Sequence, residues 1–236
     1  MNGNKFGGER LESKSSLSRN NLIEHLARYA LVVGDADKIV LDVGCGSGHG
    51  SNNLARKFKR VCGVDVSEGA IKYAKENWQE KNIDFVVGSG INIPFPRDTF
   101  DVVVAFEVFE HIEKWESFLQ EIKRVLKKDG KLYISTPNKD IYSPGTAKPI
   151  NPHHFFEMTE SEFKKAISDV FEINHFFGQR TPIYNDHWIW RVVNPIFMVF
   201  KSVISYKTNN ALKLRIINLI KPKLDMNDIV FLKTSQ

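Results

Sequence analysis

The amino-acid sequence predicts an α/β fold built around a doubly wound sheet of seven strands, with an antiparallel last strand and helices on both faces. Three observations carry this prediction. Short runs of β-branched and apolar residues, typical of buried parallel strands, alternate with amphipathic helical stripes. The first of these runs ends in a turn with alternating glycines, and the second ends in an acidic residue. Sheets of this kind bind ligands outside the carboxyl ends of their strands.

The first two predicted strands enclose a glycine-rich turn. The first strand begins at Ile39, and three alternating glycines follow it: Gly44, Gly46 and Gly48. Glycines at this spacing let the backbone turn tightly and approach a ligand closely. The helix predicted from His49 to Phe58 directs its N-terminus at that ligand. Asp65 lies 21 residues beyond Gly44, at the end of the second strand, where a carboxylate can accept hydrogen bonds from ribose hydroxyls. This order of elements predicts a nucleoside-cofactor site.

The spacing of the glycines indicates which cofactor the turn favours. The dinucleotide pattern Gly-x-Gly-x-x-Gly, counted from Gly44, requires its third glycine where His49 stands. The negative charge of Asp42 would repel a pyrophosphate, but it suits a ligand that carries sulfonium and ammonium groups. Asp42 followed by Gly-x-Gly-x-Gly resembles motif I of the class I S-adenosylmethionine-dependent methyltransferases. The resemblance implies S-adenosylmethionine as the cofactor and S-adenosylhomocysteine as the product.

Three later segments are similar to further motifs of that family, in the same order. Residues 83–87 form a third predicted strand, which is followed by Gly88-Ser89-Gly90. Residues 93–106 resemble the family's Leu-Pro-Phe-x-Asp-x-Ser-Phe-Asp-x-Val segment. Residues 107–112 resemble the family's Glu-x-x-Glu-His-Ile motif. The resemblance implies a transferase (EC 2.1.1) with a Rossmann-like core. It also implies that the cofactor is bound by Asp42, Gly44, Cys45, Gly46, Gly48, Asp65, Val66, Ser89, Gly90, Ile91 and Glu107.

Four other segments resemble one branch of the family, the type 11/23-like methyltransferases of surface-polysaccharide and glycan-biosynthesis clusters. They are residues 8–10 (Gly-Glu-Arg), 24–30, 134–139 and 151–154 (Asn-Pro-His-His). This resemblance implies that the acceptor is a sugar hydroxyl, carried by a sugar nucleotide or a lipid-linked glycan. Quinone-type and lipid-type small-molecule methyltransferases share the Glu-His-Ile motif and are the alternative within the enzyme class.

The rest of the chain supplies the remaining predicted elements. Apolar residues at helical spacing predict a helix over 115–126, and residues 131–135 form a fifth strand. The sequence Thr-Glu-Ser-Glu at 159–162 is a capping box that opens a helix to about Asp169. Residues 171–177 predict a sixth strand, and residues 229–232 predict the last one, paired antiparallel.

Four segments follow from these elements: an N-terminal helical cap (1–36), the cofactor-binding core (37–179), a basic amphipathic helical insertion (180–226) and the last strand (227–236). Residues 180–224 hold eight basic residues against Asp186, a net charge of +7, whereas the whole chain carries +5. Two interpretations stay open. The segment is either a lid or surface that meets anionic lipid head groups, or a helical hairpin packed on the core with a solvated basic face.

Composition agrees with one soluble enzyme domain. The chain has 236 residues, of which 42% are hydrophobic and 26% charged. Its two cysteines, Cys45 and Cys62, lack metal-ligand spacing, so we expect a reducing compartment and no metal site. The N-terminus lacks a charged-then-apolar signal pattern. We therefore expect a cytoplasmic protein. The basic insertion suggests an alternative, in which the protein binds peripherally to the inner face of the membrane.

Two histidines are the candidates for catalysis. A sugar hydroxyl has a high pKa and profits from a base that removes its proton, and histidine titrates near neutrality. His154 occupies the histidine position of the branch's Asn-Pro-x-His motif, which implies a base or a substrate contact. His111 follows the fourth strand, near the place where the transferable methyl group should lie. Its alternative role is to anchor the loop through backbone hydrogen bonds.

Two other classes of function are weighed against a small-molecule enzyme. The isoelectric point of about 9.1 and the basic insertion suggest nucleic acid as the acceptor. Adenine-N6 enzymes, however, carry [Asp/Asn]-Pro-Pro-[Tyr/Phe] where this chain has Glu-Val-Phe-Glu at 107–110, and neither cysteine is placed to attack a pyrimidine. A non-enzymatic cofactor-binding subunit is disfavoured by the intact glycine turn and Asp65. Nucleic acid is therefore not the expected partner.

Overall fold

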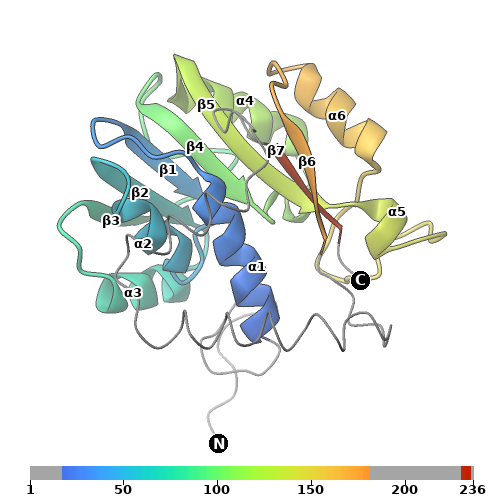
Figure 1. Ribbon diagram of the computed structural model, residues 1–236, viewed down its shortest axis with the longest axis horizontal. Helices are drawn as coiled ribbons and strands as arrows, with labels where there is room; N and C mark the ends of the chain where they lie inside the picture. The colour runs from blue at the N-terminus through green and yellow to red at the C-terminus, as the bar shows by residue number, and fades with distance from the viewer. Residues whose placement is uncertain (1–17, 181–229, 235–236) are drawn as a thin grey trace, which may run out of the picture. The chain divides into compact units, whose positions relative to one another are not determined.

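The computed structural model describes residues 18–180 and 230–234, with side chains placed for residues 25–179. Five parallel strands form the centre of its sheet, in the order β3, β2, β1, β4, β5 (Figure 1). They are β1 (Ile39–Val43), β2 (Arg60–Asp65), β3 (Ile83–Val87), β4 (Phe100–Phe106) and β5 (Leu126–Pro137). Because the strand order reverses between β1 and β4, a crevice opens at their carboxyl ends, where such sheets bind ligands. The doubly wound α/β prediction is confirmed for this core.

Helices cover both faces of the sheet. They are α1 (Ser18–Leu31), α2 (His49–Ala55), α3 (Glu68–Asn77), α4 (Trp115–Val125), the short α5 (Lys139–Tyr142), α6 (Glu160–Ser168) and a single 3₁₀ turn, η1 (Phe109–His111). None of the helices in the described parts of the chain is long and apolar enough to span a bilayer.

The alternation of side chains along β1 explains how the two helical layers form. Val40 packs in one buried cluster with Tyr29 of α1 and Leu54 of α2. Leu41 packs on the other face, in a cluster that includes Phe118 of α4 and Phe163 of α6, and all three side chains are fully buried. Successive residues of a strand point to opposite faces, so one short apolar run serves two cores.

Several predicted boundaries move by a few residues. The helix predicted over 115–126 ends at Val125, because Leu126 already pairs with Phe100 as the first residue of β5. The capping box at Thr159 is confirmed: its side chain accepts from the amide of Glu162, whose carboxylate accepts from the amide of Thr159. The sixth strand, predicted over 171–177, is β6 (Phe176–Arg180). Residues 170 and 171 instead donate their amides to the carbonyl of Ile167 and so finish the preceding helix.

The prediction of an antiparallel last strand is wrong. The strand β7 (Val230–Thr234) lies between β5 and β6 and pairs parallel with both. Antiparallel neighbours can be joined by a tight hairpin, whereas parallel neighbours need a crossover of a dozen or more residues. Residues 181–229 connect β6 to β7 and provide that length. The insertion predicted for 180–226 lies, apart from Arg180, outside the described residues and stays a prediction.

Candidate active site

A cavity of about 770 Å³ lies at the carboxyl ends of the central strands. Its wall is built from the turns after β1, β2, β3 and β4, from the loop after β5, and from one face of α1. Most of the predicted site residues line it: Gly44, Cys45, Gly46, Asp65, Val66, Ser89, Gly90, Ile91, Glu107, His111 and His154. Asp42 and Gly48 are outside this lining. The topology therefore brings both the predicted cofactor residues and the predicted catalytic residues to one cavity.

The three glycines of the first turn have different tasks, although all have a left-handed backbone. Their φ angles are 69° at Gly44, 52° at Gly46 and 82° at Gly48. A Cβ atom on Gly44 would lie 2.2 Å from a methyl group of Val108, and one on Gly48 would lie 2.7 Å from the ring of Trp78. A Cβ atom on Gly46 would meet nothing within 4 Å. Gly44 and Gly48 therefore permit close packing, whereas Gly46 turns its open side to the cavity.

Asp65 joins the glycine turn to the end of β2. One carboxylate oxygen accepts the amide of Gly46 and the other accepts the amide of Ser67, both at 2.9 Å. These two backbone donors fix the orientation of the carboxylate, which lines the cavity. Two exposed apolar residues also line the cavity: Val66 is 64% exposed and Ile91 is 39% exposed. Exposed apolar side chains beside a held carboxylate suit a nucleoside.

Asp42 lies behind the glycine turn, and the structure does not place it in the cavity wall. Its side chain is fully buried and accepts hydrogen bonds from the hydroxyls of Tyr29 (2.8 Å) and Ser51 (2.6 Å). Burial raises the pKa of Asp42 to about 7, against the lowering effect of these two hydrogen bonds. Because strand side chains alternate, Asp42 shares the face of Val40, which α1 and α2 cover. Its role in this geometry is to connect both helices to β1.

Glu107 ends β4 in a strained conformation. Its φ of 56° is in the left-handed region, which is unfavourable for a residue with a Cβ atom. Ser135 holds it there: the amide of Glu107 donates to the Ser135 carbonyl (3.1 Å) and hydroxyl (3.2 Å), and this hydroxyl donates to Glu107 Oε1 at 2.8 Å. Backbone strain that is held by surrounding contacts clusters at functional sites. The strain here directs a carboxylate into the cavity.

Arg28 is a cavity residue that the sequence analysis did not single out. Its side chain is buried, with 3% exposed. The Nη1 atom donates a hydrogen bond to Gln179 Oε1 at 2.8 Å, and the Nη2 atom forms an ion pair with Glu107 Oε2 at 3.9 Å. Its Nε atom has no hydrogen-bond partner among the described residues. A buried donor without a partner costs free energy that a ligand acceptor would recover. The only signal in the sequence was an arginine on the apolar face of an N-terminal helix.

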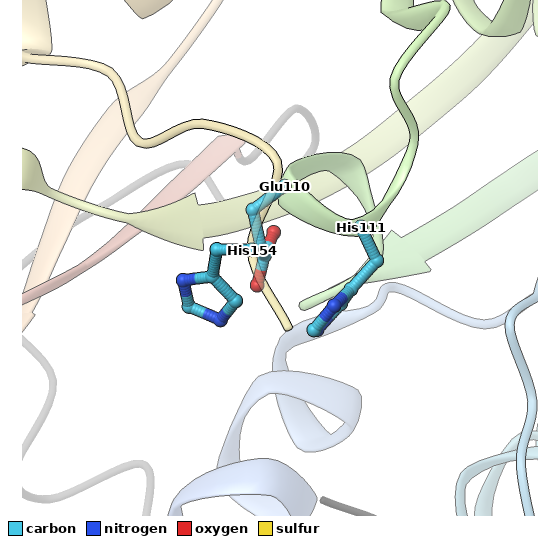
Figure 2. Close-up of side chains that lie close together, drawn as sticks. All are labelled: Glu110, His111 and His154. Carbon is cyan, nitrogen blue, oxygen red and sulfur yellow. The ribbon is translucent and has the colours of Figure 1, made fainter. Parts of the chain in front are cut away.

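A polar cluster faces the opposite part of the cavity. It consists of Glu110 and His111 from η1 and His154 from the loop after β5 (Figure 2). The two imidazole rings are 4.9 Å apart and nearly perpendicular, and Figure 2 shows the Glu110 carboxylate between them. The loop is fixed by a hydrogen bond from the amide of Phe155 to the carbonyl of Glu110. This contact brings together residues that are more than forty positions apart in the sequence.

Glu110 is the buried member of the cluster. Its side chain accepts the hydroxyl of Thr136 at 2.9 Å. Burial, followed by the nearby negative charge of Glu107, raises the pKa of Glu110 to about 8. A carboxyl group with such a pKa changes its protonation state close to neutral pH, as groups in active sites often do.

The two histidines are held differently. His111 Nδ1 lies 3.0 Å from the carbonyl oxygen of His153. His154 has a 3% exposed side chain, with Nδ1 at 2.7 Å from Glu157 Oε1 and Nε2 at 3.0 Å from Asn151 Nδ2. Both ring nitrogens of His154 are thus engaged by the protein. The sequence analysis placed His154 first as the base, whereas this geometry favours His111.

Comparison with known proteins gives a consistent result. Residues 41–134 match the family model of a methyltransferase domain. The chain is 33% identical over 144 residues to a probable S-adenosylmethionine-dependent methyltransferase of Mycolicibacterium smegmatis, which covers 61% of this chain and 55% of that protein. It is 30% identical over 156 residues to the mitochondrial ubiquinone biosynthesis O-methyltransferase of Schizosaccharomyces pombe, covering 63% and 56%. The chain thus spans about half the length of these relatives.

The structure has a similar neighbour among solved proteins. An S-adenosylmethionine-dependent methyltransferase from Aquifex aeolicus superimposes with a TM-score of 0.51 at 25% identity, over 62% of this chain and 78% of that one.

Proposed function

We propose that this chain is a class I S-adenosylmethionine-dependent methyltransferase that transfers a methyl group to a hydroxyl of a small-molecule acceptor, an activity of class EC 2.1.1. One observation carries the proposal: the glycine turn with Asp65 and the cluster of Glu110, His111 and His154 line the same cavity. The glycine turn with Asp65 can bind a nucleoside, and the polar cluster can accept a proton. A cofactor-binding subunit without activity would not need the polar cluster.

The cavity residues fit S-adenosylmethionine. The carboxylate of Asp65 lines the cavity and suits the ribose hydroxyls, and Val66 and Ile91 offer apolar surface to an adenine ring. Nε of Arg28, which has no hydrogen-bond partner among the described residues, suits the cofactor's carboxylate, and the carboxylate of Glu107 suits its ammonium group. When bound, S-adenosylmethionine supplies a methyl group that its sulfonium has already made electrophilic. Holding the acceptor in line with that group is then the main task of the protein.

The polar cluster handles the proton of the acceptor hydroxyl. The carbonyl of His153 can only accept, so His111 Nδ1 carries a hydrogen and the basic lone pair of the neutral ring is on Nε2. His111 is thus our first candidate for the group that takes up the proton as the carbon–oxygen bond forms. His154 contacts the acceptor and orients the loop, since Glu157 and Asn151 fix its ring.

A left-handed glycine offers a test of the cofactor subsite. Alanine at Gly46 should cost about 1–2 kcal/mol of folding free energy, because its φ is 52°. Gly145 is a matched control, since its φ is 71° and its Cβ position is also open. We expect Gly46→Ala and Gly145→Ala to lower thermal stability equally, but only Gly46→Ala to weaken S-adenosylmethionine binding in a calorimetric titration. Equal affinities in the two variants would remove Gly46 from the cofactor site.

We propose a sugar hydroxyl as the acceptor group, on a sugar nucleotide or lipid-linked glycan of surface-glycan biosynthesis. The support is the set of branch motifs, above all Asn-Pro-His-His at 151–154, whose last residue belongs to the cluster. The peripheral membrane contact proposed for residues 180–224 would bring such a lipid-linked acceptor within reach. It rests on the +7 charge of that segment.

A quinone-type or lipid-type acceptor is the second candidate, and a specific observation favours it. Phe155, which directly follows His154, lines the cavity and is 61% exposed. An exposed aromatic side chain at this end of the cavity suits an aromatic or acyl group. The name of the Schizosaccharomyces pombe relative, a ubiquinone biosynthesis O-methyltransferase, agrees with this alternative.

An acceptor screen tests the proposal. The purified chain is incubated with methyl-labelled S-adenosylmethionine and four acceptor classes: nucleotide sugars, lipid-linked glycans, catechol-type quinol precursors with fatty acids, and bulk RNA. We expect transfer to one of the first two classes and none to RNA. Transfer only to quinol precursors or fatty acids would rule out the sugar acceptor and support the quinone-type or lipid-type acceptor. Transfer to RNA alone would contradict the proposal of a small-molecule acceptor.

A further inference from the structure

We propose that Glu110, His111 and His154 bind a divalent transition-metal ion, for which zinc is the best match. This inference rests on the proposed function and deepens it, since the ion would bind the acceptor hydroxyl. The sequence analysis expected no metal site, on the spacing of its two cysteines. Two of the three residues proposed here are separated from the third by more than forty positions. Only the folded chain brings them together (Figure 2).

The distances within the cluster are suitable. One ligand atom from each of the three side chains lies within 4.8 Å of the other two. Zinc binds imidazole nitrogen at about 2.0–2.1 Å and carboxylate oxygen at about 2.0–2.2 Å. Two ligand atoms on one ion are therefore at most about 4 Å apart, so shifts of less than an ångström per side chain close the site.

Both histidines are held as metal-binding histidines usually are. A ligating imidazole commonly donates its other N–H to a carboxylate or a backbone carbonyl, which fixes the ring and its tautomer. His154 Nδ1 lies 2.7 Å from the carboxylate of Glu157, and His111 Nδ1 lies 3.0 Å from the carbonyl of His153. Neither partner can donate, so the lone pair of each neutral ring is on Nε2. The rings therefore direct their ligand nitrogens away from these partners.

Glu110 provides a carboxylate in a position where a cation is needed. Its side chain is buried, and among the described residues no lysine or arginine forms an ion pair with it. Buried carboxylates are normally paired or bound to metals. Thr136 holds one oxygen, Oε2, and so orients the group. A second carboxylate, that of Glu107, lines the same cavity.

One neighbour competes with the ion. Asn151 Oδ1 accepts the amide of His153 at 2.9 Å, so its amide nitrogen, 3.0 Å from His154 Nε2, donates to that lone pair. An ion on His154 would replace this hydrogen bond. Asn151 is partly exposed. Because the Asn151 amide and the ion compete for the same lone pair, removal of the Asn151 side chain should strengthen metal binding.

The ligand set selects the class of ion. Two imidazoles and one carboxylate are typical of catalytic zinc sites with an open position, and of other first-row transition ions. Magnesium and calcium prefer oxygen ligands alone. An ion at an open site lowers the pKa of a bound hydroxyl, whose proton then leaves to water. The ion would thus promote loss of the proton from the acceptor hydroxyl. Without the ion, an imidazole base would remove that proton.

Direct metal binding is the test. The full chain, prepared without a histidine tag and treated with a chelator, is titrated with Co²⁺ and with Zn²⁺, read out by visible absorption and by calorimetry. We expect one ion per chain with micromolar or tighter affinity, and visible Co²⁺ bands of a four- or five-coordinate site. Binding should fall below detection in Glu110→Gln, which keeps an acceptor for Thr136, and in His111→Ala. His175→Ala, which removes an imidazole outside the cluster, should bind as the wild type does.

Two further variants separate this site from a structural role. Glu157→Gln should weaken Co²⁺ binding about 10- to 100-fold, because it alters the partner that orients His154. Asn151→Ala should tighten it. Absence of binding by the wild type, or unchanged binding in Glu110→Gln and His111→Ala with native circular dichroism, would overturn the inference. If the metal-free chain then still binds S-adenosylmethionine and transfers methyl groups, the proposed function stands and only the metal site fails.

Discussion

Replacing His111 by alanine should lower the rate of methyl transfer by about 10²- to 10⁴-fold, the usual contribution of a group that manages a proton in the transition state. The side chain is partly exposed and belongs to a single 3₁₀ turn, so its loss should cost little stability. S-adenosylmethionine affinity should stay nearly unchanged, because His111 belongs to the polar cluster with Glu110 and His154 and not to the glycine turn. Single-turnover kinetics together with calorimetry would measure both quantities.

Comparison with the second histidine makes this prediction sharper. His154→Ala should also lower turnover and spare cofactor affinity, but it should destabilise the fold as well, since it leaves the buried Glu157 carboxylate without its partner. His175→Ala serves as the control for losing an imidazole. The contradicting result would be a His111→Ala variant whose cofactor affinity falls as much as its rate. That result would show that His111 supports the cofactor site and has no direct part in the chemistry.

Replacing Asp65 by alanine should weaken S-adenosylmethionine binding first. Hydrogen bonds to a charged group contribute about 1.5–3 kcal/mol each, so losing those to the ribose should lower the affinity about 10- to 100-fold or more. The same change removes the acceptor for the Gly46 amide and so loosens the turn. Turnover at saturating cofactor should fall much less than the affinity. Calorimetric titration gives the binding constant directly.

Asp84→Ala is a matched control for this variant. Asp84 lies on the neighbouring strand β3 and forms an exposed ion pair with Arg60, outside the cavity. Exposed pairs of this kind contribute little to stability. We expect wild-type cofactor affinity for Asp84→Ala. An affinity of Asp65→Ala equal to that of Asp84→Ala would contradict the assignment of Asp65 to the ribose.

The cofactor half of the site could be predicted from the sequence because its determinants are local. The glycine turn follows directly from β1, and Asp65 ends the adjacent parallel strand, so sequence order alone places them together. Asp42, which the sequence analysis named as a cofactor residue, lies outside the cavity lining for a local reason too. Its charge suggested a ligand, but the alternation of strand side chains gives it to the face that α1 and α2 cover.

The acceptor half could be predicted only in part because its determinants are distant. His111 and His154 were named, yet nothing in the sequence shows that Glu157 and Asn151 engage both nitrogens of His154. Arg28 was missed because its contacts to Gln179 and Glu107 span most of the chain. The direction of β7 was missed because an apolar run has the same pattern whichever way it pairs.

Calorimetric titration of the wild-type chain with S-adenosylmethionine, with NAD as the control ligand, tests the central claim most directly. We expect micromolar binding of S-adenosylmethionine at one site per chain and no binding of NAD. This expectation rests on the glycine spacing, on the open side of Gly46 and on the Nε atom of Arg28, which has no hydrogen-bond partner among the described residues. Binding of NAD alone, or of neither ligand by the folded chain, would contradict it and would remove the basis for the acceptor site as well.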